Sequence, residues 1–114
     1  VLQALLLLND PQYFQAAQTL AQRVLKDGGD ADEARLNHLF RLCTSRSLDN
    51  MGMSELKGLL IDQRSAYKDD LDAAKKLIAV GGVASEESMD AVEVAAWTMV
   101  ANVVLNLDEV GTKN

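Results

Sequence analysis

Acidic side chains gather at two places in the sequence where carboxylates could bind a metal ion or move a proton. The first is the segment DGGDADE, residues 27–33, which invites comparison with a calcium-binding loop. Such a loop needs oxygen ligands at alternating positions and a closing glutamate. The alternation fails here, and His38 stands at the closing position counted from Asp27. The segment is predicted to be a solvated turn that caps a helix, with calcium binding as the less favoured alternative.

The second place holds Asp69, Asp70 and Asp72, which are close in sequence. Two carboxylates that assist one reaction must face a common pocket. On a continuous helix these three side chains splay around the axis and do not converge. We therefore expect an exposed charged face, paired with neighbouring lysines at helical spacing.

Glu93 is the acidic residue that stands within an apolar helical segment. A buried carboxylate would have a raised pKa and could act as an acid or a base. It also lies in the first turns of its predicted helix, where the helix dipole favours an anion. The structural role is the favoured interpretation.

Other catalytic and metal-binding patterns are missing from the sequence. His38 is the single histidine, and the sequence contains no Cys-x-x-Cys pair, no Cys-x-x-Cys-His haem attachment motif and no glycine-rich phosphate loop. The single Cys43 cannot form an internal disulfide and is predicted to be a small apolar side chain. We expect no catalytic residue, no metal ligand and no cofactor-binding residue in this chain.

The composition predicts one soluble helical domain over residues 1–114. Apolar residues make up 48% of the chain and charged residues 25%, with one proline and good helix formers in abundance. The net charge of −6 argues against binding nucleic acid or an anionic membrane, because both need a cationic surface. A basic protein partner is compatible with this charge.

The sequence opens with a leucine-rich run, VLQALLLLND. The run is too short to cross a membrane, and no basic region precedes it as in a signal peptide. We interpret it as the stub of a preceding helix, with further protein upstream. If exposed, its leucines would form an apolar interface with a neighbouring domain; these are Leu2, Leu5, Leu6 and Leu8.

Helix start and stop signals divide the rest of the chain into four predicted helices. Asp10-Pro11 is a strong start, and Gly28-Gly29 and Gly81-Gly82 are stops. The boundaries follow from these signals and from apolar periodicity. The predicted helices run from Pro11 to about Asp27, from Asp30 or Asp32 to Cys43, from a cap at Ser54 to about Val80, and from Ser88 or Asp90 to about Leu107, with a loop at 44–52.

The last of these helices is apolar nearly all round, which is typical of a central helix. Trp97 supplies its largest contact area, and its indole N–H is expected to need a hydrogen-bond partner if buried. No strand pattern is present. The predicted fold class is all-α, an irregular four-helix bundle plus the stub of a preceding helix.

Three segments together resemble a known family. They are LQALLLLNDPQYFQAAQTLAQRVL, then LFRLCTSRSL with SELKGLL after it, and AAWTMVANVVLNLDE. In this order they look like the C-terminal part of the planctomycete-type domain of unknown function that follows cytochrome-c-like domains in large exported proteins. The sequence departs from the family at Ser45-Arg46-Ser47, where Gly-Arg-Pro is usual. It also has Val110-Gly111 in place of a bulky aromatic residue.

The resemblance implies a setting more than an activity. It places the chain in an exported protein, periplasmic or at the cell surface, with haem c in an upstream domain and none in this chain. The family's signature positions are expected to be structural; they are Asp10, Arg41, Arg46, Trp97, Asn106 and Asp108.

Three hypotheses about function follow. The favoured one is a non-catalytic helical module that packs against upstream domains of the same protein or against another protein. The first alternative is part of an enzyme site completed by upstream residues, with Glu93, Asp108 or Arg41 lining a shared cleft. The second is an acidic docking surface for an electron-transfer partner.

Overall fold

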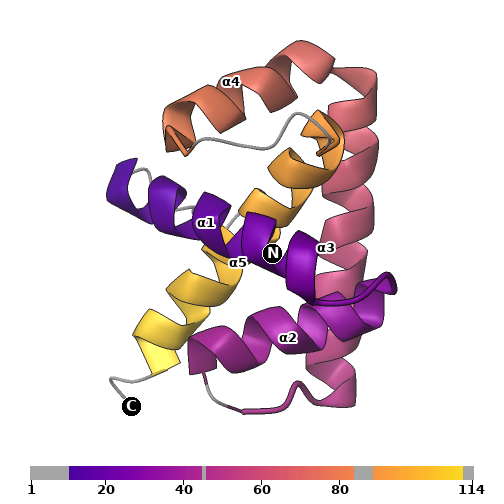
Figure 1. Ribbon diagram of the computed structural model, residues 1–114. Helices are drawn as coiled ribbons and strands as arrows, with labels where there is room; N and C mark the ends of the chain where they lie inside the picture. The colour runs from indigo at the N-terminus through magenta and orange to yellow at the C-terminus, as the bar shows by residue number, and fades with distance from the viewer. Residues whose placement is uncertain (1–10, 45, 84–88, 112–114) are drawn as a thin grey trace.

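The chain folds as an all-α assembly around its last helix (Figure 1). The computed structural model describes residues 11–44, 46–83 and 89–111, and the side chains of 14–44, 46–83 and 89–107. The predicted stub, the Asp10 cap and the four leucines before it lie outside the described residues. Five helices are described: α1 (Pro11–Asp27), α2 (Asp32–Thr44), α3 (Asn50–Asp69), α4 (Leu71–Gly81) and α5 (Ala91–Gly111).

Helix α5 is the centre of the fold, as its all-round apolar sequence predicts. It packs against each of the other four described helices, and Trp97 is fully buried. Helix α1 crosses it through a stripe of fully buried residues at helical spacing, Ala17, Ala21 and Val24. The small alanines let the two backbones approach closely, and the central position of α5 is confirmed.

Two features of the buried polar groups on α5 refine the sequence prediction. The Thr98 hydroxyl donates a 2.6 Å hydrogen bond to the Val94 carbonyl, one turn earlier in the helix. The indole Nε1 of Trp97 has no hydrogen-bond partner among the described residues, contrary to expectation. An unpaired buried N–H costs roughly 1–3 kcal/mol, and the large apolar area of the ring offsets that cost.

The predicted third helix is two helices, because the chain turns a corner at Asp70. The backbone of Asp70 leaves the helical region, with φ −141° and ψ 81°, while its N–H still bonds to the Ala66 carbonyl. Its carboxylate then accepts a 3.1 Å hydrogen bond from the Ala73 N–H and caps α4. A single aspartate therefore ends one helix and begins the next.

Helix α3 also begins earlier than predicted. Its N-cap is Asp49, whose carboxylate accepts a 2.7 Å hydrogen bond from the Gly52 N–H, and not Ser54, which lies exposed within the helix. Part of the predicted loop at 44–52 is thus helical. The other boundaries lie near their predicted places: α1 ends before Gly28, and α2 begins at Asp32, which is its first helical residue and not its cap. Helix α5 begins just after Asp90 and extends to Gly111, beyond the predicted end at Leu107.

The end of α4 lies very close to α1. Gly81 is buried, and a Cβ atom added there would collide with the side chain of Gln18. Gln18 is itself fully buried, and its amide donates a 3.2 Å hydrogen bond to the Val83 carbonyl. The missing side chain at Gly81 is therefore what lets α1 and α4 meet.

This contact predicts opposite effects for two glycine substitutions. Gly81→Ala should lower the free energy of unfolding by about 1–3 kcal/mol, because the new methyl group would overlap the fully buried side chain of Gln18. Gly58→Ala, within α3 and with no atom within 4 Å of the new methyl group, should raise it by about 0.5–1 kcal/mol. Urea unfolding followed by circular dichroism measures both, and an unchanged stability for Gly81→Ala would contradict the close approach.

Candidate functional site

The acidic turn between α1 and α2 is a structural connection in the described contacts. Arg35 donates a 2.8 Å hydrogen bond from Nε to the Gly29 carbonyl and a longer one to the Leu25 carbonyl, which closes the end of α1. Gly29 adopts a positive φ of 86°, which favours glycine. Asp30 is exposed, whereas Asp32 points to α3. Within residues 11–44, 46–83 and 89–111 no group of three acidic, cysteine or histidine side chains could hold a metal ion.

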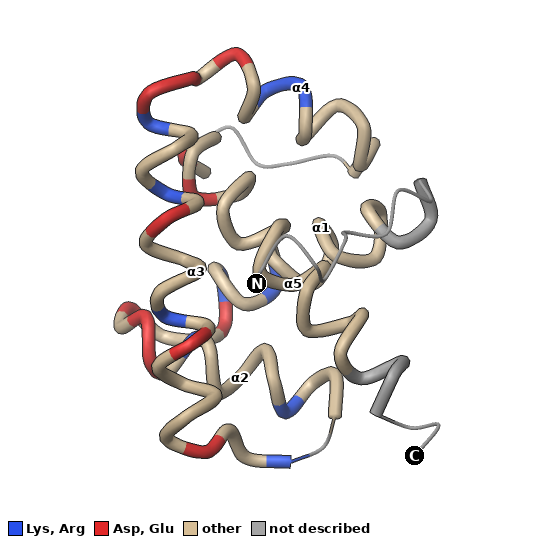
Figure 2. Tube along the Cα trace, turned by 180° about the vertical axis from the view of Figure 1, so that it is seen from behind, with Lys and Arg blue, Asp and Glu red and all other residues tan. Residues whose placement is uncertain are grey.

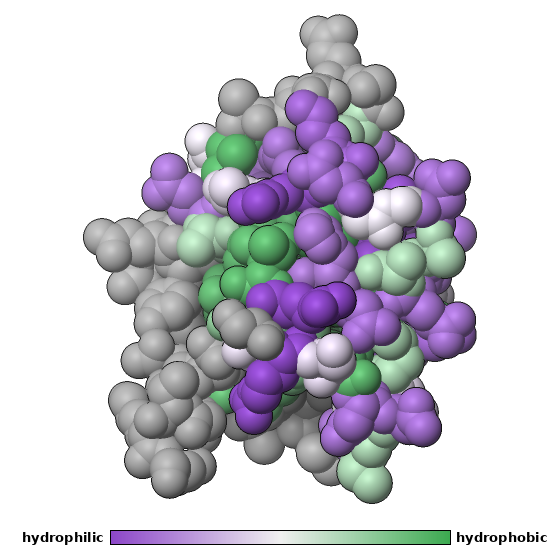
Figure 3. Space-filling view, turned by 60° about the horizontal axis from the view of Figure 1, so that its bottom comes forward, coloured by the Kyte–Doolittle hydropathy of each residue, from purple (hydrophilic) through white to green (hydrophobic). Residues whose placement is uncertain are grey.

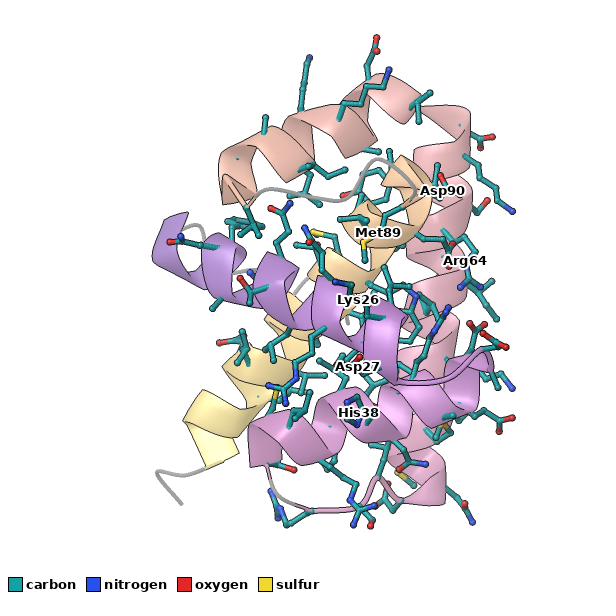
Figure 4. All side chains as sticks on the ribbon, in the orientation of Figure 1. Lys26, Asp27, His38, Arg64, Met89 and Asp90 are labelled. Carbon is teal, nitrogen blue, oxygen red and sulfur yellow. The ribbon has the colours of Figure 1, made fainter. Side chains whose placement is uncertain are left out.

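One cluster of charged side chains joins three helices. Arg64 of α3 donates hydrogen bonds from Nε and Nη2 to the Glu93 carboxylate at 2.7 and 2.8 Å. Its Nη1 and Nη2 also donate to the Asp32 carboxylate at 3.0 and 3.1 Å. We call Asp32, Arg64 and Glu93 the charge clasp; Figure 4 shows Arg64 directed from α3 toward α2 and the start of α5.

The charge clasp is half-buried, which makes it stronger than an exposed ion pair. The side chains of Arg64, Glu93 and Asp32 are 21%, 24% and 30% exposed. Both forks of the guanidinium are engaged, a geometry that lysine cannot reproduce. By contrast, the pair between Lys57 and Glu33 links the same two helices, α3 and α2, at 3.7 Å with both side chains exposed.

The hydrogen bonds of the clasp shift the pKa values of its members. The hydrogen bond from Arg64 holds the pKa of Asp32 below its ordinary value, and burial opposes this shift. Hydrogen bonds to Asp32 and then to Glu93 raise the pKa of Arg64 above its usual range, so the guanidinium stays charged. The clasp is therefore an arrangement of one cation between two carboxylates.

Sequence reasoning singled out Glu93 but missed Arg64 and the role of Asp32. A signal was present: Arg64 lies four residues after Leu60 and three before Tyr67, within the apolar stripe of α3. A charged residue in such a stripe needs a partner once it is covered. Neighbouring sequence could not identify that partner, because both carboxylates come from other helices.

A shallow hollow of about 220 Å³ lies at the other end of α2, where the chain passes from α2 into α3. Its lining combines apolar side chains with the charged residues Arg46, Asp49 and Glu55. Apolar surface bordered by hydrophilic side chains is also visible on the face turned forward in Figure 3. We call this site the α2–α3 hollow; it is lined by Phe40, Arg46, Ser47, Leu48, Asp49, Gly52, Glu55, Leu56 and Leu107.

The charged residues at the edge of the hollow differ from those of the clasp. Arg46 and Glu55 are exposed, and neither forms an ion pair with a described residue. Asp49 uses its carboxylate to cap α3. The volume of the hollow is below the 300–1,000 Å³ or so of typical small-molecule sites. It is somewhat larger than the cavity of about 150 Å³ that holds a benzene-sized group, so it suits a side chain better than a cofactor.

The residues at the family's signature positions do not form one site. Arg41 is exposed on α2, Arg46 borders the hollow, Trp97 is in the core, and Asn106 is half-buried near the end of α5. The side chain of Asp108 lies outside the described residues, as do Asp10 and the candidate interface residues Leu2, Leu5, Leu6 and Leu8.

The shared enzyme cleft considered from the sequence needs two of Glu93, Asp108 and Arg41 to converge, and of these the structure describes the side chains of Glu93 and Arg41. Glu93 meets Asp32 in the first turn of α2, and Arg41 follows nine residues later. At 1.5 Å per residue this places them roughly 13 Å apart along the helix. These two candidates therefore do not face a common pocket.

The acidic residues at the corner between α3 and α4 are exposed, and Asp70 is a helix cap. Figure 2 shows them as red segments at this corner, interspersed with basic residues. Lys68, Lys75 and Lys76 are the exposed basic residues there. The corner is thus a surface of mixed charge. None of the described helices is long and apolar enough to span a membrane.

Comparison with known proteins assigns the chain to a family. The model of PSD1, a protein of unknown function (DUF1553), matches residues 1–60, which is 60 of the 114 residues. The chain therefore belongs to this family. Neither the curated proteins nor the solved structures gave a match. All residues lining the α2–α3 hollow except Leu107 fall within the matched segment.

The clasp predicts that substituting Arg64 lowers the free energy of unfolding much more than substituting Lys57, although both residues lie on α3. Arg64→Met should lower the free energy of unfolding by about 1–3 kcal/mol, because two half-buried carboxylates lose their hydrogen-bond donor. Lys57→Met, which also removes an ion pair between α3 and α2, should cost less than about 1 kcal/mol. Urea unfolding at pH 7 compares them, and equal losses would show that the clasp is no stronger than an exposed pair.

The lowered pKa of Asp32 predicts a specific dependence of stability on pH. A carboxyl group whose folded pKa is depressed stabilises the fold above its unfolded pKa of about 3.9. This contribution is lost as pH falls through the folded value. Asp32→Asn should therefore be less stable than the unsubstituted chain at pH 7, and the difference should shrink below about pH 4. The exposed Asp30→Asn is the control, and urea midpoints across pH 2–7 that run parallel for Asp32→Asn and the unsubstituted chain would contradict the assignment.

Proposed function

We propose that this chain is a non-catalytic helical interaction module within a larger exported protein that also carries a cytochrome-c-like domain. The observation that carries the proposal is the α2–α3 hollow, whose lining combines apolar side chains with the exposed charges of Arg46 and Glu55, which form no ion pair with a described residue. Protein-binding surfaces combine an apolar centre with a polar rim. The exported setting and the upstream haem domain rest on the sequence resemblance.

The distribution of charge supports binding over catalysis. Three half-buried charged groups, Asp32, Arg64 and Glu93, satisfy one another across three helices. The charges that remain available, Arg46 and Glu55, lie exposed on the rim of the hollow, where a partner could reach them. The charge clasp, which stabilises the fold, thus lies at the start of α2, and the proposed binding surface lies at its end.

The leucine-rich segment provides a separate proposed contact. Leu2, Leu5, Leu6 and Leu8 would pack against upstream domains of the same protein, as their apolar pattern suggests. Replacing these four leucines with serine should leave the isolated chain folded. A strong loss of thermal stability would assign them to the core instead.

Photo-crosslinking in the full-length protein tests the binding role of the hollow. A benzophenone amino acid placed at Leu107 should cross-link to a polypeptide that mass spectrometry can map. The same probe at Val80 should not, although Val80 is at least as exposed, at 55% against 43%. If position 107 captures no more peptide than position 80, the hollow is not a protein-binding surface. A signal peptide and a Cys-x-x-Cys-His motif in the full-length gene product would support the exported, haem-linked setting, and the lack of both would refute it.

A further inference from the structure

The rim of the α2–α3 hollow carries both signs of charge within a short stretch of chain. Arg46 lies in the connection between α2 and α3, and Glu55 lies in the second turn of α3. Both side chains are exposed, and no ion pair joins either of them to a described residue. They differ in this from Arg64, whose donors are all directed to carboxylates of its own chain.

Two bulky apolar side chains stand beside this rim. Met51, next to Gly52 of the lining, is 73% exposed, the most exposed of the large hydrophobic residues described. Leu107, part of the lining itself, is 43% exposed. One molecule therefore presents a side-chain-sized hollow and, on the residue that precedes Gly52 of its lining, an exposed flexible side chain of about the size that such a hollow accepts.

A surface with a hollow, an exposed flexible side chain and both signs of charge has the elements from which a self-complementary contact can be made. In a two-fold dimer, residue i of one copy meets residue j of the other, and j meets i. Arg46 of each copy can then face Glu55 of the other copy, which gives two ion pairs across the interface. Each Met51 enters the hollow of the opposite copy. A partner of uniform charge would leave one of the two rim charges opposed by its own sign, which costs affinity.

We infer that the α2–α3 hollow binds a second copy of this chain about a two-fold axis, with Met51 inserted into the opposite hollow and Arg46 paired with Glu55 across the interface. This inference rests on the proposed function, because it names a second copy of the chain as the partner that the hollow binds. The contact is closed, because each copy uses the same surface, so association ends at the dimer.

Charge reversal in the 114-residue chain tests the pairing. Sedimentation equilibrium at 150 mM salt should show that Arg46→Glu and Glu55→Arg each raise the dimer dissociation constant at least tenfold, since each creates two like-charge pairs. The double variant Arg46→Glu/Glu55→Arg should return to within about threefold of the unsubstituted chain, because reversed pairs are again opposite in sign. An equimolar mixture of the two single variants should form a heterodimer with both pairs restored.

Matched controls separate the interface from general effects of charge. Asp62→Arg places the same new charge on an exposed site of α3 that is not part of the hollow and should leave the dissociation constant within about threefold. Met51→Glu should dissociate the dimer while leaving the melting temperature of the monomer unchanged, because this side chain is already exposed. Circular dichroism verifies that every variant is folded.

The outcomes distinguish this inference from the function on which it rests. A chain that stays monomeric at millimolar concentration, or a double variant that fails to recover, overturns the two-fold dimer. If the probe at Leu107 then cross-links to another part of the full-length protein, the hollow is still an interaction surface with a different partner. If it cross-links to nothing, the proposed function fails as well.

Discussion

The structure depends on covering one helix that has no polar side over most of its length. Helix α5 buries Val94, Ala95, Trp97 and Val103 at once, and at 3.6 residues per turn these residues point in several directions around its axis. Each fully buried large side chain contributes roughly 1.5–3 kcal/mol relative to an exposed one. The four surrounding helices cover α5 on its different sides. The small residues of α1 and α4 allow these two helices to pack closely.

The charge clasp constrains the relative positions of three helices, which apolar packing alone does not fix. Apolar contacts are not directional, so they do not by themselves fix where α2 and α3 lie along α5. A planar guanidinium that satisfies two carboxylates from two other helices does fix their relative positions. In this fold the hydrophobic core supplies most of the stabilisation, and Arg64 supplies a defined register for three of the helices.

The sequence was sufficient for everything that depends on local pattern. The all-α class, the central position of the tryptophan-bearing helix and the stops at Gly28-Gly29 and Gly81-Gly82 follow from residues close together in the chain. The corner at Asp70 could not be seen, because the apolar positions from Leu56 to Ile78 fit one continuous helix as well as two. Asp49 and Ser54 are both good caps, so the choice between them required the structure.

The candidate site was harder to predict than the fold, for a physical reason. In the clasp, Arg64 is separated by 29 positions in the sequence from Glu93 and by 32 positions from Asp32. The hollow joins the end of α2 to the end of α5. Neither arrangement has a periodicity along the chain. Arg46 was singled out through family resemblance, and the structure places it on the rim of the hollow. Met51 and Glu55 had no signal in the sequence that distinguished them from other surface residues.

The corner at Asp70 has a consequence for local unfolding of the molecule. Helix α4 is short, and among its residues only Ala74 and Gly81 are buried, so little apolar area holds it to α1 and α5. A one-residue joint separates it from the longer, better-anchored α3, and such a unit opens at a lower free energy than the whole domain. Swinging α4 outward would uncover one flank of α5 while the clasp keeps the opposite half assembled. The corner at Asp70 is therefore the place where we expect local opening to begin.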